Sequence, residues 1–190
     1  MARTKSGDKR NTILAATTEI VAEHGTEATT AKIAKLAAVA EGSLFTYFEN
    51  KDDLFNQLYL EIKNDLLRAM MEEYPANDST KAKFQHVWVA NVRWGIAYPS
   101  KRKAIAQLGV SERVTTENKS KVSELFSEVI VLLSETVTRK SLTSVSLDYA
   151  AMVFGAVADA TIDFMLKDPQ HATAYEVAGF EAVWSAIGGD

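Results

Sequence analysis

The chain has 190 residues, of which 47% are hydrophobic and 24% charged, a composition typical of one or two globular domains. It has no cysteine, which excludes disulfide frameworks, thiolate metal sites and cysteine nucleophiles, and its three histidines are not spaced to share a metal ion. The net charge of −4 argues against a protein that simply coats nucleic acid or an anionic membrane.

Apolar residues recur at three- and four-residue steps and prolines are few, so the sequence predicts an all-α protein. The first expected helix, over residues 8–24, ends at Gly25, a residue that suits a left-handed helix cap. Two short helices over 30–37 and 41–47 follow, with Thr29 or Thr30 as the N-cap of the first. Asn50 is the expected N-cap of a long helix over 51–73. The remaining helices are expected over 80–97, 101–110, 117–139, 146–167 and 172–187.

The N-terminus is polar and lacks the apolar core of a signal peptide, and the most apolar stretch, 150–166, is interrupted by Asp159 and Asp163. We therefore expect a soluble cytoplasmic protein without a membrane partner. The two aspartates lack a histidine or third carboxylate nearby in the sequence, so a solvated face is favoured over a metal or acid–base site. Phosphate-binding, dinucleotide-binding, serine-nucleophile and zinc-protease motifs are absent from the sequence, which predicts neither enzyme activity nor a cofactor.

Residues 29–48 have the proportions of a helix-turn-helix. Apolar residues such as Ile33, Leu44 and Phe48 are spaced to pack the two short helices together and against the first helix. The second short helix keeps a polar outer face that would fit a DNA major groove. Such shapes also occur as plain packing motifs in helical proteins, so the spacing alone does not decide between the two readings.

A longer string of residues resembles the DNA-binding domain of TetR-family transcriptional regulators, over about residues 8–58. The matching positions are Thr29-Thr30, Ile33-Ala34, Ala37, Val39, Gly42-Ser43-Leu44, Tyr47-Phe48, Lys51 and Leu54. The resemblance implies a helix-turn-helix DNA-binding domain over residues 1–50 and a larger helical ligand-binding and dimerisation domain over 51–190. By the same resemblance, Tyr47 and Lys51 contact phosphates, and Ser43 and Thr46 face the groove. The full set of expected DNA-binding residues is Thr30, Lys32, Glu41, Gly42, Ser43, Thr46, Tyr47 and Lys51.

Two positions depart from the family pattern. The glycine in the turn is Ala38 here, and alanine at a positive φ costs on the order of 1 kcal/mol. The tyrosine that would donate to a phosphate is Phe45, which removes one hydrogen bond, worth about 0.5–1.5 kcal/mol. Residues 1–60 carry 7 lysines and arginines against 8 aspartates and glutamates, so we expect few phosphate contacts for each subunit and a modest salt dependence.

Aromatic and methionine side chains gather in the C-terminal two thirds of the chain, where the resemblance implies a small-molecule pocket. The residues expected to line it are Met70, Phe84, Trp88, Asn91, Tyr98, Phe126 and Phe164. For each of them, ordinary core packing is the competing interpretation.

The last two expected helices place small and apolar residues at helical spacing, and the resemblance implies that two copies of this pair form a four-helix dimer interface. The residues expected there are Ala151, Phe154, Gly155, Ala158, Phe180 and Trp184. The same pattern also fits a pair that closes the core of one subunit, and the sequence does not separate the two.

The sequence thus indicates a homodimeric repressor that binds a palindromic double-stranded DNA operator and is released by a small-molecule effector. The alternatives are an all-α ligand-binding protein or enzyme that has lost DNA binding, and a protein–protein adaptor built of helical hairpins. The sequence leaves open the identity of the effector, the operator, the regulated genes and the direction of regulation.

Overall fold

The computed structural model describes residues 2–137 and 146–188, with side chains from Gly7 onward, and the elements in these ranges are α-helices and two short 3-10 helices. The all-α prediction is confirmed. By internal contacts the chain divides into two compact units: unit 1 comprises Met1–Asp65 and Tyr98–Val122, and unit 2 comprises Leu66–Ala97 and Ser123–Asp190.

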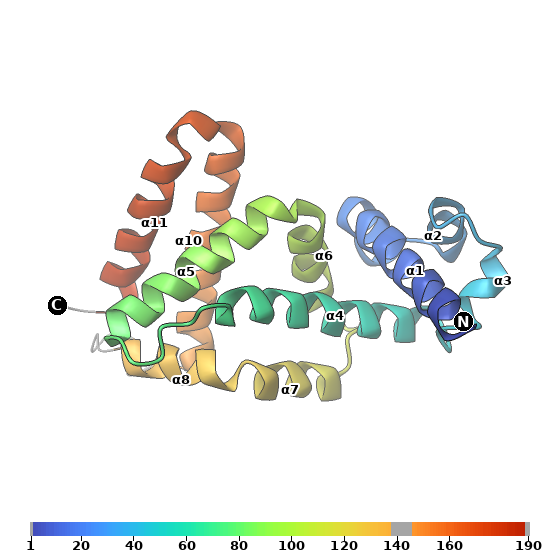
Figure 1. Cartoon of the computed structure of the whole chain (residues 1–190), viewed down its shortest axis with the longest axis horizontal. Helices are drawn as coiled ribbons and strands as arrows, with labels where there is room; N and C mark the ends of the chain where they lie inside the picture. Colours follow the sequence, from blue (N-terminus) through green and yellow to red (C-terminus); the bar gives the residue numbers. More distant parts are fainter. Residues whose placement is uncertain (1, 138–145, 189–190) are drawn as a thin grey trace. The chain divides into compact units, whose positions relative to one another are not determined.

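Unit 1 holds α1, the 3-10 helix η1, the two short helices α2 and α3, the first part of α4, α6 and the first part of α7 (Figure 1). Their bounds are α1 Ala2–His24, η1 Gly25–Glu27, α2 Thr30–Leu36, α3 Glu41–Leu44, α4 Lys51–Met71, α6 Pro99–Gly109 and α7 Thr116–Leu125. The short helices α2 and α3 pack on each other, and α1 packs on both α2 and α6. The core of unit 1 therefore includes residues from a distant stretch of sequence, such as Ala104 and Leu108, which are fully buried.

Local backbone signals fix the ends of the N-terminal helices as the sequence predicts. Gly25 has φ +60° and ends α1 in the left-handed conformation. The hydroxyl of Thr29 accepts from the Lys32 backbone N–H at 3.3 Å, which makes Thr29 the N-cap of α2. The side chain of Asn50 accepts from the backbone N–H of Asp53 at 2.8 Å, at the start of α4. These signals determine where α1 ends and where α2 and α4 begin.

One buried amide ties α4 to the segment that leads into α7. Asn56 is buried, and its Nδ2 group donates to the backbone carbonyls of Asp52 and Arg113 at 2.7 and 2.8 Å. Its Oδ1 atom accepts from the Thr115 backbone N–H at 3.0 Å and from the Asn118 side chain at 2.8 Å. The side-chain oxygen and nitrogen of Asn56 are thus both hydrogen-bonded, as a buried amide requires.

Unit 2 holds the end of α4, α5 (Thr80–Ala97), α8 (Ser127–Thr136), α10 (Leu147–Lys167), the 3-10 helix η2 (Pro169–His171) and α11 (Ala172–Ile187). Helices α10 and α11 form an antiparallel hairpin, and α5 packs against both (Figure 1). An aromatic cluster fills the space between these three helices, with neighbouring ring centroids 5.6–6.4 Å apart; its members are Phe84, Trp88, Phe154, Phe180 and Trp184.

Close helix packing in unit 2 depends on one glycine. A Cβ atom at Gly179 of α11 would lie 2.3 Å from Thr161 Oγ1 and 2.7 Å from Trp88 Cζ2, so only glycine fits at this crossing. The Trp88 indole N–H donates to the carbonyl of Glu176 at 3.0 Å, and Arg93 of α5 forms two hydrogen bonds to the Glu176 carboxylate. The face of α11 that bears these residues is therefore fixed against α5 and α10.

Three of the expected helices differ from the structure by three residues or more. Helix α1 begins at Ala2 rather than at residue 8, because no proline or helix cap between these two positions interrupts it. Helix α3 ends at Leu44 rather than at residue 47, because the chain turns over residues 45–47. The helix expected over 117–139 is divided at Phe126 into α7 and α8, and its last residues, 138 and 139, lie outside the described part of the chain.

Within the described residues, α10 is the one helix long and apolar enough to cross a membrane, judged by length and composition alone. Only 28% of its most apolar 18-residue window is buried in the single chain. Its exposed side combines Met152 and Phe164 with the aspartates Asp159 and Asp163. Much of the apolar surface of α10 is thus uncovered.

Candidate functional site

Helices α2 and α3 are joined by a four-residue turn, and Ala38 in this turn has φ +54°. The family pattern has glycine at this position, and the positive φ that makes alanine costly there is present. An L-residue in the left-handed region costs on the order of 1 kcal/mol, and the contacts on either side of the turn must compensate for it. The Val39 N–H donates to the Ala34 carbonyl at 3.0 Å and so closes the end of α2 across the turn.

Two apolar side chains fasten the region of α3 to unit 1: Leu44 and Phe48 are both almost fully buried. The side chains between and before them are accessible. Glu41, Gly42, Phe45 and Thr46 are exposed, and Ser43 and Tyr47 are half-buried. The structure therefore presents five of the eight expected DNA-binding residues in one short segment, held from behind by its two buried anchors.

Two of the expected DNA-binding residues bind each other. The Thr30 hydroxyl at the start of α2 donates to Glu41 Oε1 at the start of α3, at 2.5 Å. This bond links the first turns of the two helices and gives the carboxylate a partner within the protein. Glu41 is consequently restrained, and its negative charge stays on the α2–α3 surface.

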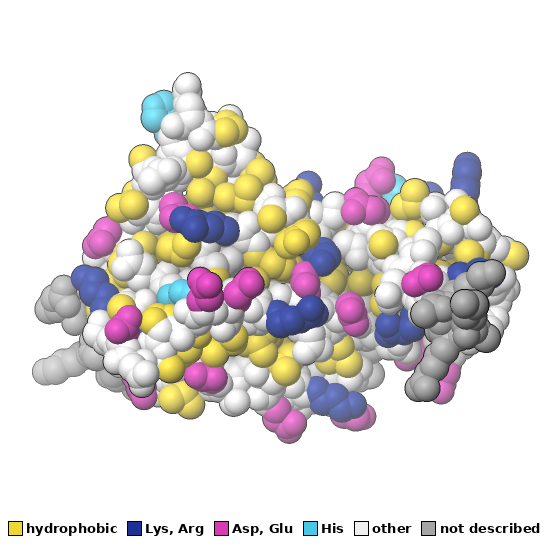
Figure 2. Space-filling model, viewed as in Figure 1, with side chains coloured by type: hydrophobic (Ala, Val, Ile, Leu, Met, Phe, Trp, Pro, Cys, Tyr) yellow, Lys and Arg dark blue, Asp and Glu magenta, His cyan; other side chains and the backbone are white. Residues whose placement is uncertain are grey.

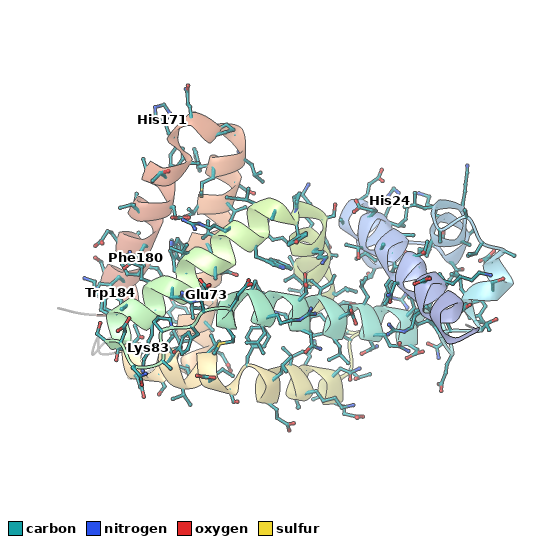
Figure 3. All side chains as sticks on the ribbon, viewed as in Figure 1. His24, Glu73, Lys83, His171, Phe180 and Trp184 are labelled. Atoms are coloured by element: carbon teal, nitrogen blue, oxygen red, sulfur yellow. The ribbon has the colours of Figure 1, made fainter. Side chains whose placement is uncertain are left out.

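The two lysines expected to contact phosphates also have partners within unit 1. Lys32 Nζ lies 3.0 Å from His24 Nε2, to which it donates when that ring nitrogen is unprotonated; Figure 3 shows His24 at the end of α1. Lys51 Nζ donates to the Thr26 carbonyl at 3.0 Å and lies 5.2 Å from the ring centroid of Phe55. An ammonium group has three N–H donors, so these contacts leave each lysine further donors for a phosphate oxygen.

The Lys51 ammonium is in a less favourable environment than a free lysine. Partial burial lowers its pKa below the ordinary value of 10.5, and the nearby Arg113 guanidinium lowers it further. The carboxylates of Glu27 and Asp52 act in the opposite direction. A phosphate at this position would relieve the repulsion from Arg113, which is an electrostatic reason for an anion to bind here.

Basic and acidic side chains are interspersed over the face shown in Figure 2 and do not form a broad basic patch there. Sequence reasoning missed the internal partners of Lys32 and Lys51. A histidine eight residues before a lysine, or a carbonyl 25 residues before one, gives no pattern that a sequence can show. The roles of His24 and of the Thr26 carbonyl follow only from the fold.

The residues expected to line a ligand pocket fall into two groups. Met70, Phe84 and Trp88 are buried in unit 2, and Asn91 and Phe126 are half-buried there. The other two are largely exposed: Phe164 projects from α10, and Tyr98 belongs to unit 1, with Lys101 Nζ 4.5 Å from its ring centroid. In the single chain neither of these two side chains is buried in the interior of its own unit.

The residues expected at a dimer interface are also divided. Ala151 is exposed, and Phe154 and Gly155 are half-buried. Ala158, Phe180 and Trp184 lie in the core of unit 2, where Phe180 and Trp184 pack against Phe84; Figure 3 labels both α11 residues. Since their side chains are already covered within one chain, the accessible apolar residues of the hairpin are different ones: Tyr149, Met152, Phe164, Leu166 and Val177.

Comparison with known proteins points to one group of regulators. Residues 13–58 match the profile of the family described as "Bacterial regulatory proteins, tetR family". A 72-residue alignment to the fatty acid metabolism regulator protein of Bacillus subtilis (strain 168) shows 35% identity and covers 37% of this chain and 37% of that protein. The match to this curated relative thus spans little more than a third of its length.

The solved structures of similar fold extend over the whole chain. A TetR family transcription regulator from Marinobacter aquaeolei VT8 superposes with a TM-score of 0.83 at 19% identity, covering 99% of this chain and 100% of that one. The transcriptional regulator FadR from Bacillus subtilis, solved in complex with stearoyl-CoA, superposes with a TM-score of 0.66 at 22% identity over 93% and 98% of the two chains. At these identities the superpositions establish the fold.

Proposed function

We propose that this chain, which belongs to the TetR family of bacterial transcriptional regulators, represses transcription from a palindromic operator as a homodimer. A small molecule that binds in unit 2 releases it from the DNA. The family consists of transcriptional regulators and not of enzymes, and a regulator of this kind acts in the cytoplasm. The observation that carries the proposal is the helix-turn-helix of unit 1, with an accessible, largely polar segment on two buried anchors.

The DNA-binding roles follow from accessibility and chemistry. Ser43 and Thr46 have hydroxyls that both donate and accept, and we assign them to base edges in the major groove. Tyr47, Lys32 and Lys51 are assigned to phosphates, which fix the position of the protein on the duplex without reading sequence. The Thr30–Glu41 pair holds the two helices in register, and Gly42 allows the backbone of α3 to approach the DNA. The functional division between residues 1–50 and 51–190 is part of this proposal.

We assign the dimer surface to the exposed side of the α10–α11 hairpin. Met152, Phe164 and Val177 are 73%, 53% and 55% exposed in the single chain, and a second copy of the hairpin would cover them. A two-fold axis presents two recognition helices to a palindrome, with half-sites about 34–36 Å apart for one turn of DNA. The small residues Ala151 and Gly155 on α10 leave room for a neighbouring helix, and a Cβ at Gly155 would meet no atom within 4 Å in the single chain.

The effector is proposed to bind in unit 2, beside Met70, Phe84, Trp88, Asn91 and Phe126. These side chains are mostly apolar and aromatic, which favours an effector with an apolar body. The relative solved with stearoyl-CoA makes a long-chain acyl-CoA the first molecule to test. Release requires that the effector bind the DNA-incompetent state more tightly, because a ligand with equal affinity for both states shifts no population.

The test begins with selection of duplexes from a random-sequence pool by the full-length chain at low salt, followed by anisotropy titrations of the selected sequence. We expect an inverted repeat, bound by two subunits. Thr46→Ala should change the preference between related sites, whereas Lys51→Ala should weaken all sequences about equally. Because Lys51 also bonds Thr26, the thermal unfolding of that variant is measured alongside.

A dimer that enriches no sequence would overturn the regulator proposal and favour a ligand-binding protein that has lost DNA binding. Equal losses of affinity and an unchanged site preference in both variants would contradict the assigned roles. Addition of stearoyl-CoA to the protein–DNA complex tests the effector class separately, with dissociation as the expected result. An unaffected complex would exclude acyl-CoA and leave the DNA-binding result unchanged.

A further inference from the structure

Phe45 is an exposed aromatic residue on the surface that we assign to DNA. It caps the C-terminal end of α3, directly after the buried anchor Leu44, and is itself 49% exposed. Among the described residues, no ring or cation lies against it, whereas Arg10 lies 5.7 Å from the ring centroid of Phe48 and Lys51 5.2 Å from that of Phe55. Within the described part of unit 1, the Phe45 ring thus has no aromatic or cationic partner.

The chemistry of the ring limits what it can contact on a duplex. Phenylalanine has no donor or acceptor, so it cannot hydrogen-bond a phosphate or the polar edge of a base. The apolar group that B-form DNA presents in its major groove is the C5-methyl of thymine. A side chain that loses water without making a hydrogen bond gains free energy only where it meets such a group.

The surroundings of Phe45 also disfavour a phosphate next to it. Glu41 lies four residues earlier, one helical turn away, and its carboxylate is held at the surface by the Thr30 hydroxyl. A negative charge at that distance repels the phosphate backbone and repels the bases much less. The polar candidates Glu41, Lys32 and Lys51 meanwhile have partners within unit 1. The accessible side chain directly before Thr46 is thus an apolar ring.

Resting on the DNA-binding function proposed above, we infer that Phe45 is a specificity-determining residue that reads the methyl group of one thymine in each operator half-site. A tyrosine at this position would contact a phosphate through its hydroxyl, and that contact carries no sequence information. Phenylalanine instead provides a contact that distinguishes thymine from cytosine. Phe45 adds a base contact to those assigned to Ser43 and Thr46.

The experiment combines a change in the protein with a change in the DNA. Each thymine of the selected operator is replaced in turn by deoxyuridine, which removes only the C5-methyl, and the affinity of the full-length chain is measured for each duplex. With the unmodified protein, one position in each half-site should lose about fourfold in affinity, the factor expected for one buried methyl group. With Phe45→Ala, the same replacement should change the affinity by less than about 1.5-fold.

Matched variants test whether the ring of Phe45 itself causes the deoxyuridine sensitivity. Phe45→Tyr keeps the ring and should keep the deoxyuridine sensitivity at the same position, and Phe45→Leu should keep part of it. Circular dichroism should show no loss of folded structure in Phe45→Ala, because the side chain is half exposed. The inference is overturned if Phe45→Ala retains the full deoxyuridine profile, if it weakens all duplexes alike, or if no thymine methyl matters to an operator that is bound specifically. If the selection yields no duplex, it is the regulator proposal that fails.

Discussion

The α2–α3 surface of unit 1 and the α10–α11 surface of unit 2 are both accessible in the single chain, but they differ in composition and in internal order. On α2–α3 two of the charged side chains are restrained by partners, since Thr30 bonds Glu41 and His24 contacts Lys32. On α10–α11 large apolar side chains such as Met152 and Val177 are accessible, beside the exposed aspartates Asp159 and Asp163. The first surface suits a charged, hydrated partner that binds and leaves, and the second suits a lasting protein partner.

The packing beneath the two surfaces differs as well. The segment around α3 is held by two anchors, Leu44 and Phe48, and by caps at the helix ends. The hairpin of unit 2 is held by a cluster of five aromatic rings and by the helix crossing at Gly179. Unit 2 should therefore respond most strongly to loss of packing, and the α2–α3 region to changes in its turn.

The largest effect is expected from removal of a buried ring. Trp88→Ala removes a fully buried indole that packs against Phe154 and donates to the Glu176 carbonyl, and should lower the free energy of unfolding by about 3–5 kcal/mol. Urea unfolding followed by circular dichroism measures it. The matched control is Phe45→Ala, which truncates an aromatic side chain on the α2–α3 surface of unit 1. It should lower the free energy of unfolding by less than about 0.5 kcal/mol. A similar loss of unfolding free energy in the two variants would contradict the proposed difference between the units.

The second effect concerns association. Met152→Asp places a charge on the exposed side of α10 and should raise the dimer dissociation constant at least about 100-fold, because a partner helix would have to bury the new carboxylate. Sedimentation equilibrium measures the constant. Val110→Asp changes an even more exposed apolar residue, in unit 1, and should leave the dimer intact. A dimer insensitive to Met152→Asp would show that the α10–α11 surface has another use.

The third prediction compares one backbone position in each unit. Ala38 and Glu73 have φ values of +54° and +53°, so a glycine at either relieves a left-handed strain. Ala38→Gly and Glu73→Gly should each raise the free energy of unfolding by about 1 kcal/mol. The control Ala37→Gly, at a right-handed position, should lower it by about 1 kcal/mol. Chemical denaturation of the three variants measures the differences, and destabilisation by Ala38→Gly would mean that the turn is not strained.

The smallest effect is a dependence on pH. The hydrogen bond from His171 lowers the pKa of Asp168 below its ordinary value of 3.8, and the Tyr175 hydroxyl lowers it further. A carboxyl with a lowered pKa in the folded state contributes stability above about pH 4, and this contribution is lost as the pH falls through the lower folded value. Asp168→Asn should therefore make the stability of unit 2 less sensitive to pH between about pH 5 and pH 3.

Glu117 gives the corresponding comparison in unit 1, since the hydrogen bond from Lys121 lowers the pKa of its carboxyl in the same direction. Glu117→Gln should flatten the same part of the acid unfolding curve. Glu117 is exposed and Asp168 is partly exposed, so both changes should be much smaller than that of Trp88→Ala. Acid unfolding curves of the two variants are compared with that of the unmodified chain. Steeper curves for the variants would contradict the direction assigned to the two pKa shifts.

The sequence predicts those parts of the fold that depend on neighbouring residues. Gly25, Thr29 and Asn50 act as caps where expected, because each role depends on a few consecutive backbone groups. The positive φ of Ala38 lies at the turn position where the family pattern has glycine. The break at Phe126 was missed, since the apolar spacing continues through it and only the packing of α8 on α5 and α10 shows that the helix turns.

Other assignments depend on contacts between distant elements, which a single sequence does not reveal. The sequence places Phe180 and Trp184 at helical spacing, but that they are covered within one chain depends on how α11 packs, with Gly179 close to Thr161 of α10 and Trp88 of α5. The partners of Lys32 and Lys51 likewise come from α1 and η1 and follow only once these segments are placed beside α2 and α4.

The division of unit 1 into two stretches of sequence has a consequence for how the protein is made. Helices α1 to α4 are synthesised before α6, although α6 supplies the buried Ala104 and Leu108 and packs on α1. At about 5–20 residues per second, the wait between Asp65 and Val122 lasts roughly 3–11 s. During that time the N-terminal helices lack part of their core. Competence for the proposed DNA binding would thus come only after residues 98–122 have been synthesised, and a fragment cut after α4 should not fold as unit 1 does.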